Sequence, residues 1–231
     1  LSAADSPFNK YSTGNLKTLD KPGLRDALIS FHRDNYSADR MSLVFYHNQS
    51  LDVMESTVKD IFSPIEDKRT RGQSYKECPP VYAKGAMGTI TRVIPMQDRD
   101  TLSIIFTIPE AYTRRLSKPL SYLTHILGHE CAGSIADTLI NKGYALGVNA
   151  SYDHTLDYFT NVELKISLTD TGLQNIDAIL ETVGDYLHLL RQTPPQSWIY
   201  EEIRKMAELR FNYRSNSSPS DTAVEIAAAL R

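Results

Sequence analysis

Residues 144–168 read YALGVNASYDHTLDYFTNVELKISL, and this stretch decides the fold. Apolar and polar residues alternate along 144–152 and again along 158–168, with the polar segment 153–157 between them. Successive side chains of a strand point to opposite faces of a sheet, so the alternation predicts two antiparallel strands with one buried face. Such a pair needs further elements to cover its apolar face.

The residues after this pair predict the helices that could cover it. Between 170 and 191 the apolar residues recur at helical spacing and form one stripe, made of Leu173, Ile176, Ile179, Leu180, Val183, Leu187 and Leu190. Pro194-Pro195 ends that helix, and a second helix is predicted over 196–213. Ser218-Pro219 starts a third, which we expect to run to Arg231.

The residues before the pair predict more elements of both kinds. Helices are expected over 116–129 and 134–141, and β-branched runs at 89–95 and 101–109 predict a hairpin around the polar turn 97–100. Strands in pairs and helices in pairs, without regular alternation, predict an α+β fold. We expect antiparallel sheets with helices packed on one face.

The first part of the chain predicts a separate group of elements. Helices are expected over 21–36 and 51–65, on either side of a strand-sized apolar run at 41–46. Residues 66–83 are charged, then polar, then Pro-Pro, without periodicity, which is typical of a linker. We therefore predict one domain in residues 1–65, a linker at 66–83 and a second domain in residues 84–231.

Composition excludes several classes of function. The 231 residues include 25 basic and 28 acidic side chains, for a net charge of −3. Nucleic acid is not an expected partner, because phosphate binding needs clustered Lys and Arg. No apolar run approaches the roughly 20 residues that cross a bilayer, so no membrane partner is expected. Cys78 and Cys131, without a C-x-x-C motif, indicate a reducing, cytoplasmic location.

Residues 122–133, YLTHILGHECAG, contain the main candidate for a chemical site. His125 and His129 are four residues apart on a predicted helix, so they share a face and could bind zinc together. A metalloprotease helix needs H-E-x-x-H or H-x-x-E-H, so that the Glu activates a water, and neither pattern is present. We therefore expect no catalytic residue and no metal here, with helix-end packing or peptide contact as the role. An independent zinc site is the alternative.

Several segments together resemble the insulinase (pitrilysin) family of inverted-motif zinc metalloproteases, with the insulin-degrading enzyme branch as the best match. The resemblance covers nearly the whole chain. It rests on FNKYSTGN (8–15), FHRDNYSADRMSLVFYHNQSLD (31–52), YLTHILGHECAGSI (122–135), LTDTGL (168–173) and QSWIYEEI (196–203).

The resemblance implies that this chain is a fragment of an enzyme with four similar α+β domains, which close around a chamber and cut the enclosed peptide. Residues 1–65 would be the C-terminal part of the first domain, and residues 84–231 most of the second, non-catalytic domain. The H-x-x-E-H helix would lie upstream, so zinc is expected in the full-length parent and not in this fragment. The start at Leu1, without Met, indicates a cut end.

The resemblance also implies a substrate-anchoring site in the second domain, which grips the amino-terminal end of the peptide. One matching segment contains His125, Gly128, His129 and Glu130 at a helix end. The other is a strand whose backbone could pair with a peptide, and it consists of Val148, Asn149, Ala150, Ser151 and Tyr152. Residues 149–151 differ from the family pattern, which is richer in glycine.

Two classes of function stay open at this point. The chain could supply chamber wall and substrate grip to a zinc endopeptidase, or it could belong to a catalytically silent family member that acts as a structural or partner subunit. The expected partners are peptide substrates and the remaining domains of the parent chain. A homodimer through an open sheet edge is a further option.

Overall fold

The computed structural model describes residues 2–4, 6, 9, 13–69, 81–95, 99–109, 114, 116–153, 159–215 and 217–230. The backbone divides into two compact units: unit 1 contains Leu1–Thr89 and Arg214–Arg231, and unit 2 contains Ile90–Tyr213. The linker predicted at 66–83 lies largely outside the described residues. The predicted domain boundaries therefore stay a prediction.

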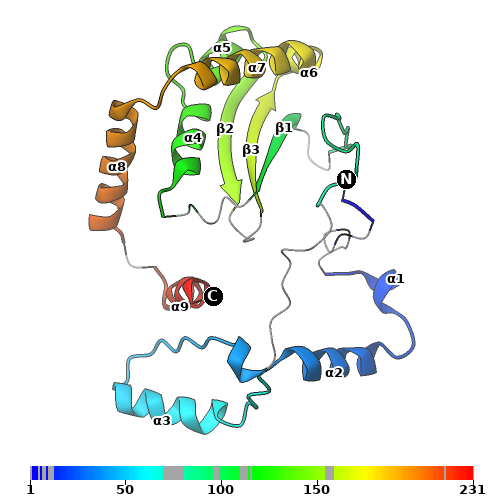
Figure 1. Ribbon diagram of the computed structural model, residues 1–231, viewed down its shortest axis with the longest axis vertical. Coiled ribbons are helices and arrows are strands. Elements are labelled where there is room, and N and C mark those ends of the chain that lie inside the picture. The colour runs from blue at the N-terminus through cyan, green and yellow to red at the C-terminus, as the bar shows by residue number, and fades with distance from the viewer. Residues whose placement is uncertain are drawn as a thin grey trace. The chain divides into compact units, whose positions relative to one another are not determined.

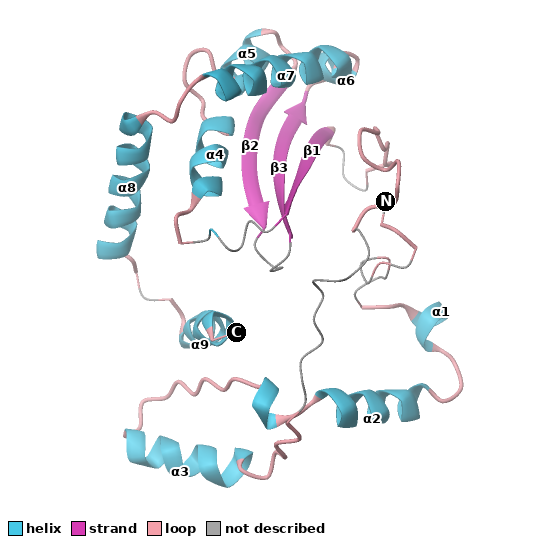
Figure 2. Cartoon of the chain, in the orientation of Figure 1, coloured by secondary structure: helices cyan, strands magenta, loops and turns pink. Residues whose placement is uncertain are grey.

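Unit 2 contains a three-stranded antiparallel sheet in the order β1-β3-β2 (Figures 1 and 2). Its strands are β1 (Thr101–Pro109), β2 (Ala145–Asp153) and β3 (Phe159–Leu168). The pairs Val148↔Ile166 and Ala150↔Leu164 join β2 to β3 in the antiparallel sense. The strand pair predicted from the alternating stretch is confirmed.

One face of this sheet carries the hydrophobic core. On β3 the even-numbered residues from Val162 to Leu168 are buried, whereas Lys165 and Ser167 are exposed. The buried face packs against α4 (Pro119–Leu127), α5 (Ile135–Asn141) and α7 (Ile176–Gln192). These helices contribute Leu127, Ile135, Ala136, Leu139, Ile179 and Val183. The predicted α+β class, with helices packed on one face of an antiparallel sheet, is confirmed.

Capping residues and one hydrogen bond define the ends of the helices near β2. α4 begins at Pro119 and ends at Leu127, with Gly128 as its C-terminal cap, and Figure 1 shows it beside β2. α5 begins after Ser134, whose side-chain oxygen accepts the backbone N–H of Asp137 at 3.1 Å. α8 (Ser197–Asn212) is joined to α4 at its start, because the backbone N–H of Gln196 donates to the Tyr122 hydroxyl at 2.7 Å.

Two strand predictions are wrong. β1 pairs with β3 from Thr101↔Ser167 to Pro109↔Phe159, and residues 89–95 form no strand. Residues 41–46 are also without strand structure. Both runs have β-forming composition, but a strand needs a partner edge, and neither run pairs with a strand among the described residues.

The single helix predicted over 170–191 is also wrong, because it is divided into α6 (Asp170–Leu173) and α7. Thr169 accepts the N–H of Gly172 at 2.9 Å on its side-chain oxygen and so caps α6. Asn175 then leaves the helical conformation, with φ −123° and ψ 37°. Gly and Asn form helices weakly, and Gly172 and Asn175 lie on either side of the break between α6 and α7.

Unit 1 is built from helices and loops in its described part. It contains α1 (Leu16–Leu19), α2 (Leu24–Asn35), the short 3-10 helix η1 (Ala38–Arg40), α3 (Leu51–Phe62) and α9 (Pro219–Ala229). α2 and α3 agree with the helices predicted at 21–36 and 51–65. None of these elements contains a buried residue.

Among the described residues of both units, no helix has the length and apolar character to cross a bilayer.

Candidate functional site

The C-terminal end of α4 lies directly against β2. A Cβ atom added to Gly128 would lie 3.2 Å from the backbone nitrogen of Ala150 and 3.3 Å from the carbonyl oxygen of Thr124. These separations are tighter than ordinary van der Waals contact, so glycine lets the strand backbone approach the helix end. The two segments that the sequence identified as one site are therefore neighbours in space.

A pocket of about 380 Å³ opens at this junction. It is lined by Thr124, His125, Gly128, His129, Glu130, Asn149 and Ala150. The other predicted site residues lie outside this lining. Val148 is buried in the core, Ser151 is exposed, and the Tyr152 hydroxyl is hydrogen-bonded to the Ser121 hydroxyl at 2.8 Å. Their part in anchoring stays a prediction.

The two histidines are in contact inside this pocket. Their ring centroids are 5.2 Å apart and the rings meet edge to face, with an interplanar angle of 79°. Nδ1 of His129 accepts the backbone N–H of Cys131 at 3.1 Å. Nε2 of His125 is buried and has no hydrogen-bond partner. A buried polar atom without a partner costs about 1–3 kcal/mol, so a ligand that bonded to it would be favoured.

Glu202 of α8 joins the histidines, and sequence reasoning missed it. One ligand atom from each of His125, His129 and Glu202 lies within 4.8 Å of the other two. The bond from Gln196 to Tyr122 brings the start of α8 to α4 and so places Glu202 there. Glu202 does lie in the segment 196–203 that carries the family resemblance, but no spacing rule links it to the histidines.

The loop after α4 also affects a neighbouring tyrosine. Burial raises the pKa of the Tyr186 phenol, and the nearby Cys131 thiol adds to the increase. Cys131 itself is an exposed free cysteine. The pocket lining around His129 contains polar and acidic groups, and it lacks the Glu-between-histidines pattern that activates a water in a protease helix.

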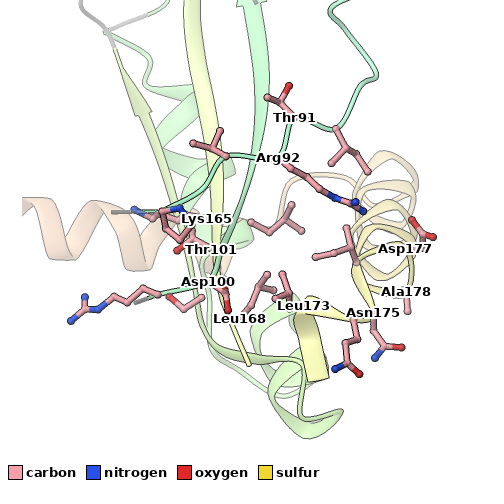
Figure 3. Close-up of a pocket in the computed structure, with 18 residues that line it drawn as sticks. Thr91, Arg92, Asp100, Thr101, Lys165, Leu168, Leu173, Asn175, Asp177 and Ala178 are labelled. Atoms are coloured by element: carbon pink, nitrogen blue, oxygen red, sulfur yellow. The ribbon is translucent and has the colours of Figure 1, made fainter. Parts of the chain in front are cut away.

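A larger pocket of about 1460 Å³ lies elsewhere in unit 2 (Figure 3). Its walls come from residues 90–93 and 95, the adjoining ends of β1 and β3, the end of α6 and the start of α7. Arg92, Arg99 and Lys165 bring positive charge, and Asp100 and Asp177 bring negative charge. Its charges are mixed and no predicted site residue lines it, so the junction of α4 and β2 is the better candidate site.

A family model matches most of the chain. Residues 24–207 match the family model described as Peptidase M16 inactive domain. The chain belongs to the M16 peptidase family. The matched range includes α4, β2 and α8 as far as Ala207, and with them every residue of the candidate site. The predicted insulinase resemblance is confirmed.

Individual M16 relatives match along the full chain. The insulin-degrading enzyme of Drosophila melanogaster is 31% identical over 237 residues, which cover 100% of this chain and 24% of that protein. The A-factor-processing enzyme of Saccharomyces cerevisiae is 31% identical over 239 residues, which cover 100% of this chain and 23% of that protein. The crystal structure of pitrilysin gives a TM-score of 0.86 at 29% identity, covering 96% of this chain and 24% of that chain. The chain thus spans about a quarter of the length of the curated relatives it matches.

Proposed function

We propose that this chain is a non-catalytic part of a zinc-dependent metalloendopeptidase, and that it contributes chamber wall and an anchoring site for the amino-terminal end of a peptide. The observation that carries the proposal is the close approach of Gly128 to Ala150, which places both matching segments at one pocket. The match to an inactive M16 domain supports the non-catalytic role. We expect the catalytic zinc and its H-x-x-E-H helix in another part of the parent protein.

The chemistry of the pocket suits a peptide amine. Glu130 is exposed and lines the pocket, so its carboxylate can accept charge-assisted hydrogen bonds from a terminal ammonium group. Among the described residues β2 pairs only with β3, on one of its two edges. A peptide strand could therefore extend the sheet along the other edge of β2, starting from an amine held at Glu130.

The remaining proposals concern partners and location. The helices of unit 1 carry apolar stripes without buried residues, which suits contact with the remaining domains of the parent chain. A homodimer through an open sheet edge is the competing arrangement. We propose a cytoplasmic location, because Cys78 and Cys131 form no disulfide motif in the sequence.

The test of anchoring is a binding measurement with two short peptides of one sequence, labelled at the carboxyl end, one with a free amine and one acetylated. Fluorescence anisotropy should show about two- to fivefold weaker binding of the acetylated peptide, the range typical of an exposed ion pair. Glu130→Gln should abolish the difference. The control Glu181→Gln, an exposed position on α7, should keep it. Equal binding of both peptides by the unaltered chain would refute anchoring through the amine.

A further inference from the structure

Three side chains that can bind a metal meet at the end of α4. Their ligand atoms, one each from His125, His129 and Glu202, lie within 4.8 Å of one another. Two imidazole nitrogens and one carboxylate oxygen are a donor set that proteins use for zinc, with a fourth position left for water. We propose that these three residues bind one Zn²⁺ ion. The site shares His125 and His129 with the anchoring pocket and also needs Glu202, which has no part in the proposed peptide anchoring.

The three ligand atoms lie within 4.8 Å of one another and would move closer together around a zinc ion. Ligands at about 2.0–2.2 Å from a tetrahedral zinc ion lie about 3.3–3.5 Å from one another. His125 lies in the last turn of α4 and His129 lies two residues beyond the end of that helix, and their ring centroids are 5.2 Å apart. Glu202 is exposed, so its side chain can rotate to shorten its distance to the histidines.

His125 gives an independent reason for a ligand. Its Nε2 atom is buried without a hydrogen-bond partner, although buried polar side-chain atoms in proteins are normally partnered. A neutral imidazole with its lone pair on that nitrogen is the form that binds metals. A bound cation would satisfy the lone pair, and the cost of leaving it unpaired would disappear.

The hydrogen bond to His129 gives the site a specific signature. Because Nδ1 accepts the N–H of Cys131, the neutral ring carries its proton on Nε2. Zinc at Nε2 would move that proton to Nδ1 and break the bond, and zinc at Nδ1 would break it directly. In either case the backbone amide of Cys131 loses its acceptor when zinc binds.

The test is a zinc titration of the metal-free 231-residue chain against a chromophoric chelator, without peptide, so that it is independent of the anchoring proposal. One equivalent should bind, and the Cys131 amide should shift in a ¹H–¹⁵N spectrum. Glu202→Gln should lower the affinity at least about tenfold, since even outer-shell partners of a metal contribute about 10–100-fold. Glu201→Gln is the matched control, because Glu201 pairs with Arg204 at 2.9 Å, and it should bind zinc as the unaltered chain does.

Three results would overturn the proposal. The first is the absence of a one-equivalent binding step in a sample whose circular dichroism shows a folded chain. The second is equal zinc affinity in Glu202→Gln and Glu201→Gln. The third is zinc that persists in His129→Ala but is lost in Cys131→Ser, which would place the ion on a thiol.

Discussion

α3 in unit 1 and α7 in unit 2 are both amphipathic, but only α7 buries its apolar stripe. Ile179 and Val183 of α7 are buried against the sheet, whereas no residue of α3 is buried. The same holds for the units as wholes, because every buried hydrophobic side chain in the described residues belongs to unit 2. An apolar stripe is enough to define a helix, while a core also needs an opposing surface, which β3 provides in unit 2.

The largest expected effect tests this difference with one substitution in each unit. Leu164 on β3 is 0% exposed and Leu28 on α2 is 59% exposed. Leu164→Ala should lower the free energy of unfolding by about 2–5 kcal/mol, because it removes buried apolar surface and leaves a cavity. Leu28→Ala should change it by less than about 0.5 kcal/mol. Urea denaturation followed by circular dichroism measures both, and similar losses would show that α2 has a covered face.

A second pair of substitutions compares two glycines of unit 2, one packed against backbone atoms and one with open space beside its Cα. A Cβ at Gly172 would lie 1.9 Å from the carbonyl oxygen of Tyr144, whereas a Cβ at Gly184 of α7 would meet nothing within 4 Å. Gly172→Ala should destabilise the chain by about 1–3 kcal/mol, because backbone must move. Gly184→Ala should stabilise it by about 0.5–1 kcal/mol, since alanine favours a helix interior. Thermal unfolding distinguishes them by the sign of the change in Tm.

The smallest expected effect compares two helix starts. Ser134 caps α5 in unit 2 with a hydrogen bond to the N–H of Asp137 at 3.1 Å, whereas Ser50 precedes α3 in unit 1 without a side-chain bond. Ser134→Ala should cost about 1 kcal/mol of unfolding free energy. Ser50→Ala should cost less than about 0.5 kcal/mol. Equal costs in urea denaturation would mean that the two serines cap their helices alike.

The sequence predicted the parts of the fold that depend on local pattern. The pair β2 and β3 follows from alternation over adjacent segments. The apolar stripe predicts the helical character of α7, but it does not reveal the break that separates α6 from α7. The strand prediction for residues 89–95 is wrong because β-branched composition does not say which edge a segment will pair with. Val93 and Ile94 are β-branched residues, which favour strands, but their exposed fractions are 81% and 93%.

The candidate site also has one part that the local sequence pattern predicts and another part that it does not. The spacing of His125 and His129 predicts one helix face; the structure ends α4 at Leu127 and places His129 beyond it, but the two rings are still in contact. The family resemblance links these histidines to residues 148–152. Glu202 could not be found by spacing, because its place depends on how α8 lies against α4. Glu202 therefore had to come from tertiary structure.

The bond between Gln196 and Tyr122 also has a kinetic consequence. The backbone N–H of Gln196 is bonded to a side chain of α4 and not to a carbonyl within α8. Its exchange with deuterium should therefore report separation of the two helices, independently of the unwinding of either one. The deuterium exchange rate of this single amide should therefore measure how often α8 separates from α4, and so how often Glu202 moves away from the histidines.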